Sequence, residues 1–106
     1  MNINTYQKEA AKTAIYKDKL VYPTLGLVGE AGEIANKVKK ILRDNNGELS
    51  EEVRKNLIKE LGDVMWYCAA VATDLNTTLG EICFVNIEKL KSRQERNQIS
   101  GSGDNR

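Results

Sequence analysis

Apolar residues recur every three or four positions along almost the whole chain, and this spacing restricts the fold more than any other feature. It is the period of an α-helix with one apolar side, whereas a half-buried strand alternates every second residue. Pro23 is the only proline, so few positions force a break in a helix. We therefore predict an all-α fold, an antiparallel four-helix bundle-like protomer with helices at about 3–17, 24–44, 51–73 and 78–96.

Local signals set the limits of these helices. Pro23 suits the first turn of the second helix, and Asn45-Asn46-Gly47 is a strong turn sequence that ends it. Ser50 is a suitable N-cap for the third helix. Thr78 and Glu81 have the spacing of a capping box at the start of the fourth. These signals make the last three helices better defined than the first.

The length of 106 residues predicts one domain, which we place at 1–99. The remaining segment, 100–106, is rich in Gly and Ser and is expected to be a flexible tail. The net charge of +1 gives no indication of a nucleic-acid polymer as partner. Histidine is absent, which excludes a Ser-His-Asp triad and the HExxH zinc motif. Any chemistry must use carboxylates, lysine, arginine or a bound metal.

The two cysteines, Cys68 and Cys83, lie within apolar stretches and do not form a Cys-x-x-Cys pair. We interpret both as buried thiols in a reducing compartment. The N-terminal sequence lacks the basic and apolar regions of a leader, and no apolar run reaches the length of a membrane span. We expect a cytoplasmic protein without a membrane partner.

Residues 64–72 are apolar on every side of a helix, which is typical of a helix enclosed all round. Four short helices cannot easily enclose this segment alone, so we predict a homo-oligomer, either a dimer or a tetramer, whose second copy supplies the missing wall. Gly26, Gly29 and Gly32 recur every third residue in the preceding helix. Each glycine costs about 1 kcal/mol in a helix, a cost that close backbone approach or ligand access would justify.

Two predicted helices each carry a pair of acids at positions i and i+3. The pairs are Glu30 with Glu33, and Glu60 with Asp63. Residues three apart share a helix face, and four acids brought together would repel unless a cation compensates them. All-oxygen ligation suits Mg²⁺ or Mn²⁺. The alternative is that these are ordinary solvated acids, paired with lysines at helical spacing.

These residues resemble a known family. GLVGEAGE at 26–33, followed by ELGDV at 60–64, is similar to the signature of the MazG-like all-α nucleoside triphosphate pyrophosphohydrolases. The resemblance covers most of the chain from Leu25 onward. It extends to Asn86, Lys89, Leu90, Arg93, Arg96 and 101–106, whereas Asn97 stands where a glycine is often found.

The resemblance implies that Glu30, Glu33, Glu60 and Asp63 hold magnesium in a dimeric or tetrameric helical bundle. It also implies that a nucleoside triphosphate is split between its α and β phosphates, which would serve nucleotide-pool house-cleaning. We favour Glu33 as the base that accepts the proton of the attacking water. Three alternatives remain: a dUTPase-like enzyme, a phosphoribosyl-ATP pyrophosphohydrolase, and a non-catalytic metal-binding or oligomerisation module.

Substrate-binding candidates follow from the residues as well. Asn86, Lys89, Arg93 and Arg96 form one stripe of the fourth helix, and Arg and Lys can bind phosphates. A solvated basic helix end is the alternative. Trp66 and Tyr67, beside Asp63, and also Tyr6 and Gln7, could contact a base, although core positions remain the simpler interpretation. The tail could order over bound phosphates.

Overall fold

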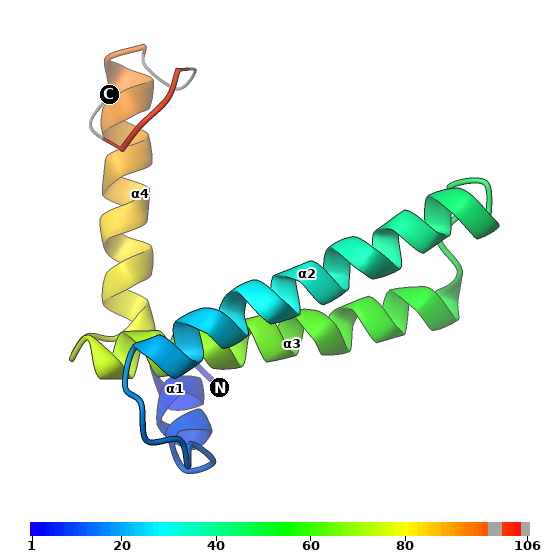
Figure 1. The fold of residues 1–106 in the computed structure, drawn as a ribbon. Helices are drawn as coiled ribbons and strands as arrows, with labels where there is room; N and C mark the ends of the chain where they lie inside the picture. The colour runs from blue at the N-terminus through cyan, green and yellow to red at the C-terminus, as the bar shows by residue number, and fades with distance from the viewer. Residues whose placement is uncertain (98–100, 105–106) are drawn as a thin grey trace.

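The computed structural model describes residues 1–97 and 101–104, which form four helices and no strand (Figure 1). The helices are α1 (Ile3–Ala11), α2 (Val21–Asp44), α3 (Glu51–Asp74) and α4 (Leu79–Glu95). The predicted all-α class and the number of helices are therefore confirmed. The predicted boundary at residue 99 and the tail residues Ser100, Asn105 and Arg106 lie outside the described residues.

The helices α2 and α3 run antiparallel, side by side, as a long hairpin (Figure 1). Their connection uses the predicted turn: Asn46 and Gly47 both have positive φ, and the Gly47 N–H donates to the Ile41 carbonyl at 3.1 Å. Ser50 then caps α3 by accepting from the Val53 N–H at 3.2 Å. Local sequence thus sets both ends of this connection.

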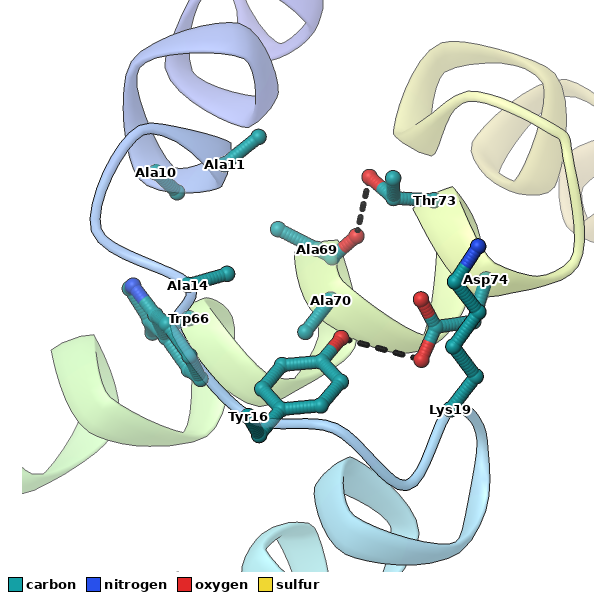
Figure 2. A pocket seen from close by; sticks show the side chains of 10 residues that line it. All are labelled: Ala10, Ala11, Ala14, Tyr16, Lys19, Trp66, Ala69, Ala70, Thr73 and Asp74. Carbon is teal, nitrogen blue, oxygen red and sulfur yellow. Dashed lines mark hydrogen bonds between the residues drawn. The ribbon is translucent and has the colours of Figure 1, made fainter.

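The helix α1 is shorter than predicted, ending at Ala11 instead of residue 17. After it, the chain turns away, and the Thr13 hydroxyl donates to the Ala10 carbonyl at 2.7 Å. A distant residue then holds the connection, because Asp74 accepts from the Tyr16 hydroxyl at 2.9 Å (Figure 2). Asp74 also accepts from the Leu20 N–H at 2.7 Å. Leu20 has a φ of 66°, and α2 begins directly after it.

One buried glutamine joins three parts of the chain. Gln7 on α1 is 7% exposed, and its amide nitrogen donates to the Thr73 hydroxyl and the Thr77 carbonyl, both at 3.0 Å. Its carbonyl oxygen accepts from the Leu79 N–H at 2.6 Å. The side chain of Gln7 is therefore occupied in joining α1 to the connection between α3 and α4. This corrects its suggested role in contacting a base.

The core of a single chain is small. It consists of the buried residues Ala10, Ala69, Ala72 and Leu79, against which Ile3, Tyr6, Trp66 and Cys68 pack. The radius of gyration is 16.7 Å, compared with about 13 Å for a compact chain of this length. One chain is thus more open than the closed four-helix bundle that the sequence predicts.

The position of α4 explains this difference. Within the described residues, α4 contacts α1 and α3 but not α2, and it projects away from the hairpin (Figure 1). Large apolar side chains along α4 are exposed, among them Phe84 and Val85. Cys83 is exposed as well, so the prediction of two buried thiols is wrong for this residue, while Cys68 is half-buried. None of the described helices is long and apolar enough to cross a membrane.

Replacing Gln7 by alanine should lower the free energy of unfolding by about 2–4 kcal/mol, because the Leu79 N–H and the Thr77 carbonyl lose their partner in a buried site. Urea unfolding at a fixed protein concentration measures this loss. Lys8→Ala, an exposed change on the same helix, is the control and should stay within about 0.5 kcal/mol of the parent protein. Equal stability of the two variants would contradict the role of Gln7.

Candidate metal and nucleotide site

Three of the four predicted acids come together between α2 and α3. Glu30, Glu60 and Asp63 each present a carboxylate oxygen within 4.8 Å of the others. Glu30 and Glu60 are half-buried, whereas Asp63 is exposed. Oxygens at this separation can bind one divalent cation together, and an all-carboxylate set is what hard ions such as Mg²⁺ prefer.

Glu33 lies outside this cluster and is exposed on α2, one turn after Glu30. Helical spacing places Glu30 and Glu33 on one side of α2. Only Glu30, however, joins Glu60 and Asp63 in the cluster. The structure thus leaves Glu33 at the edge of the site, where it faces solvent.

The electrostatics of the cluster are those of repelling acids. Partial burial, the hydrogen bond with Glu60 and the negative charges around it raise the pKa of Glu30 above its ordinary value. One cation is already close, because the Lys37 ammonium lies 3.8 Å from a Glu60 carboxylate oxygen. These two observations fit a site that gains from a bound cation, and the residues present fit Mg²⁺ or Mn²⁺.

An aromatic cluster adjoins the acids. Trp66 and Tyr67 meet edge to face with ring centroids 5.1 Å apart, and both side chains are half-buried. The Trp66 indole N–H donates to the Thr13 hydroxyl at 2.8 Å, which fixes the orientation of the ring. Thr13, Glu30, Asp63, Trp66 and Tyr67 together line one hollow. The two aromatic residues predicted to contact substrate therefore lie beside the predicted metal ligands.

The glycines of α2 and α3 have different environments. A Cβ on Gly26 would overlap the ring of Tyr67, so close approach explains this glycine. A Cβ on Gly29, Gly32 or Gly62 would meet nothing within 4 Å in one chain. The prediction of close backbone approach is confirmed at Gly26 alone, and open space remains beside the other three.

The polar stripe on α4 is held by the described part of the tail. The Lys89 ammonium contacts the Asp104 carboxylate at 3.0 Å. Arg93 is 4% exposed, and its guanidinium donates to the Asp104 carbonyl at 2.9 Å and to the Gly103 carbonyl at 3.3 Å. Asn86 is exposed. This end of α4 accordingly binds carbonyl and carboxylate oxygens, the kind of group that a phosphate also presents.

The fourth predicted residue of the stripe, Arg96, is exposed and donates to the Ser92 hydroxyl at 3.1 Å. Because α4 projects away from the hairpin, its C-terminal half lies apart from the acids of the same chain (Figure 1). The structure thus brings together three acids and two aromatic residues, and places the α4 stripe elsewhere.

The chain matches the model of the MazG nucleotide pyrophosphohydrolase domain over residues 23–97, which includes every acid of the cluster and the whole α4 stripe. It belongs to the MazG family. A relative, the Gene 37 protein of Mycobacterium phage L5, is 52% identical over 114 aligned positions that cover both chains completely. Its name states no activity. No solved structure matches the chain.

The family model begins at residue 23, whereas the structure adds residues from the preceding segment to the candidate site. Thr13 holds Trp66, and Tyr16 stacks on Tyr22 with ring centroids 5.0 Å apart. Sequence reasoning assigned no site role to Thr13, Tyr16 or Tyr22. The sequence signal that could have indicated them is the occurrence of two tyrosines shortly before Pro23. This signal does not predict which face of α3 the tyrosines contact.

Adding Mg²⁺ at roughly a hundred times its Kd should raise the unfolding temperature by about 10 °C, because a cation that binds only the folded state stabilises it. Glu60→Gln should remove most of this increase and should change the stability of the metal-free protein little, since one repelling charge is lost together with the ion pair to Lys37. Differential scanning fluorimetry measures both effects. Glu52→Gln, an exposed change on the same helix, is the matched control, and an equal Mg²⁺ response in the two variants would exclude Glu60 as a ligand.

Proposed function

We propose that this chain is a magnesium-dependent nucleoside triphosphate pyrophosphohydrolase, which converts (d)NTP to (d)NMP and pyrophosphate in nucleotide-pool house-cleaning. The observation that carries the proposal is the cluster of Glu30, Glu60 and Asp63 within 4.8 Å, inside the segment that matches the MazG domain. An all-carboxylate site beside aromatic side chains suits a substrate that combines phosphates with a base.

In this proposal Glu30, Glu60 and Asp63 hold the metal, Mg²⁺ or alternatively Mn²⁺, and Glu33 completes the site from the next turn of α2. A bound Mg²⁺ would neutralise phosphate charge and orient a water molecule. Water attacks phosphorus in line, the α–β anhydride bond breaks, and pyrophosphate leaves. Glu33, exposed at the edge of the cluster, accepts the proton of the water, because its carboxylate lies one turn from Glu30 and outside the three clustered acids.

The phosphates need donors beyond the metal, and Asn86, Lys89, Arg93 and Arg96 supply them in this proposal. Within one chain this stripe lies apart from the acids. We therefore infer a homo-oligomer in which α4 of a second copy completes each site. The exposed apolar side chains on α4 and the open space beside Gly29, Gly32 and Gly62 support such an assembly.

A panel of deoxy and ribonucleoside triphosphates tests the reaction, with pyrophosphate and orthophosphate measured separately. We expect release of pyrophosphate that stops when the metal is chelated. Asp63→Asn should lower kcat by about a hundredfold or more, because a metal ligand is lost. Glu52→Gln should retain full activity. Release of orthophosphate, or full activity of Asp63→Asn, would contradict the proposed reaction, and a single active nucleotide would show a dedicated enzyme.

Mixing two inactive variants tests whether the site is shared. Glu60→Gln and Lys89→Ala should each be inactive alone. Subunit exchange between them should restore about a quarter of the parent activity, because half of the random dimers are mixed and each has one intact site. The activity of the mixture, measured against each variant incubated alone, reports this. Mass spectrometry of the intact oligomer verifies that subunits have exchanged. If activity does not recover although exchange has occurred, the complete site lies within one chain.

A further inference from the structure

A cavity of about 150 Å³ lies next to the acids, on the other side of Trp66. Its walls come from α1, the connection after it, and the C-terminal half of α3 (Figure 2). Five alanines line it, and three of them, Ala10, Ala69 and Ala70, are buried. Tyr16 and Trp66 add two aromatic rings with centroids 6.3 Å apart, in an edge-to-face arrangement. The cavity thus offers a small, apolar space bounded by aromatic surfaces.

Polar groups gather at the end of the cavity away from Trp66 (Figure 2). Asp74 Oδ2 accepts from the Tyr16 hydroxyl and from the Leu20 N–H, while Oδ1 has no hydrogen-bond partner among the residues that the structure describes. Lys19 also lines this end and forms no ion pair within residues 1–97 and 101–104. One free acceptor and one free donor therefore line this end of the cavity.

The distance from the acids fits the two ends of a nucleotide. Ala70 lies seven residues after Asp63, which is two helical turns, or about 10 Å, along the same face of α3. Trp66 is between them and lines both the acidic hollow and the cavity. A substrate with its phosphates at the acids would pass Trp66 and place its base in the cavity.

We infer that this cavity is the base pocket and that it selects pyrimidine nucleotides over purine nucleotides, an inference that rests on the proposed function. An apolar cavity of about 150 Å³ accommodates one six-membered ring, since a cavity of that size holds benzene. A fused purine is larger. Cytosine and uracil both present an N–H and an acceptor on adjacent positions of their edge, which complements Asp74 Oδ1 and Lys19.

Trp66 is the only tryptophan in the chain and lines both the cavity and the acidic hollow, so its fluorescence reports nucleotide binding there without any turnover. In the presence of Mg²⁺, dCMP and dUMP should quench it saturably, whereas dAMP and dGMP should bind at least about tenfold more weakly. Pyrophosphate release should show the same order for the corresponding triphosphates. Equal quenching by purine and pyrimidine monophosphates would overturn the inference.

Ala14→Leu, which fills the cavity from the connection after α1, should weaken quenching by dCMP at least about tenfold while the Mg²⁺-dependent rise in unfolding temperature persists. That rise shows that the variant is folded with its acids in place. Ala35→Leu, the same change at an exposed position on α2, is the control and should bind dCMP as the parent protein does. Unchanged quenching in Ala14→Leu would overturn the assignment.

These results separate the inference from the proposed function. Pyrophosphate released equally from purine and pyrimidine triphosphates would keep the reaction and reject the pocket. Selective quenching by dCMP and dUMP without release of pyrophosphate from any triphosphate would keep the pocket and reject the reaction.

Discussion

The other three helices all pack against α3, and this constraint determines where every candidate functional group lies. Its middle pairs with α2 and brings Glu60 and Asp63 to Glu30. In its C-terminal half, Ala69 and Ala72 are almost fully buried. Because these side chains are small, α1 and α4 can approach α3 closely. Larger side chains at these two positions would separate the helices, because a packed core has no spare volume. The helix α3 thus carries two of the three clustered acids and two of the four buried core residues.

The features that sequence reasoning predicted correctly have local causes. Ser50 and Thr78 accept from backbone N–H groups three residues later, so α3 and α4 begin where their caps indicate. The pairing of acids on α2 and α3 also follows from a spacing within each helix. The connection after α1 is instead held by a distant residue, because Asp74, which accepts from the Leu20 N–H, lies 54 residues after Leu20. No local pattern around Leu20 reveals such a partner.

In the candidate site too, some features follow from local sequence and others depend on residues far away in the chain. Helical spacing identifies Glu30, Glu60 and Asp63, but it does not show that Glu33 stays outside the cluster, because that depends on how α2 packs on α3. Gly26 was recognisable as unusual, yet its reason is the ring of Tyr67 on another helix. The direction of α4 was not predictable, because its apolar positions indicate that it packs without saying against which helix or which chain. Its exposed apolar side chains are available to pack against a second copy of the chain.

The connection between α1 and α2 is anchored on α3 at both ends of the cavity, through Thr13 on Trp66 and through Tyr16 and Leu20 on Asp74. None of these bonds involves the three clustered acids. Residues 14, 15 and 17–19, which lie between these anchors, can therefore change without removing a bond that holds the segment on α3. If the cavity is a base pocket, a lineage could exchange one nucleotide preference for another by altering these few positions alone, and protein engineers could randomise them as a cassette while leaving the three clustered acids unchanged.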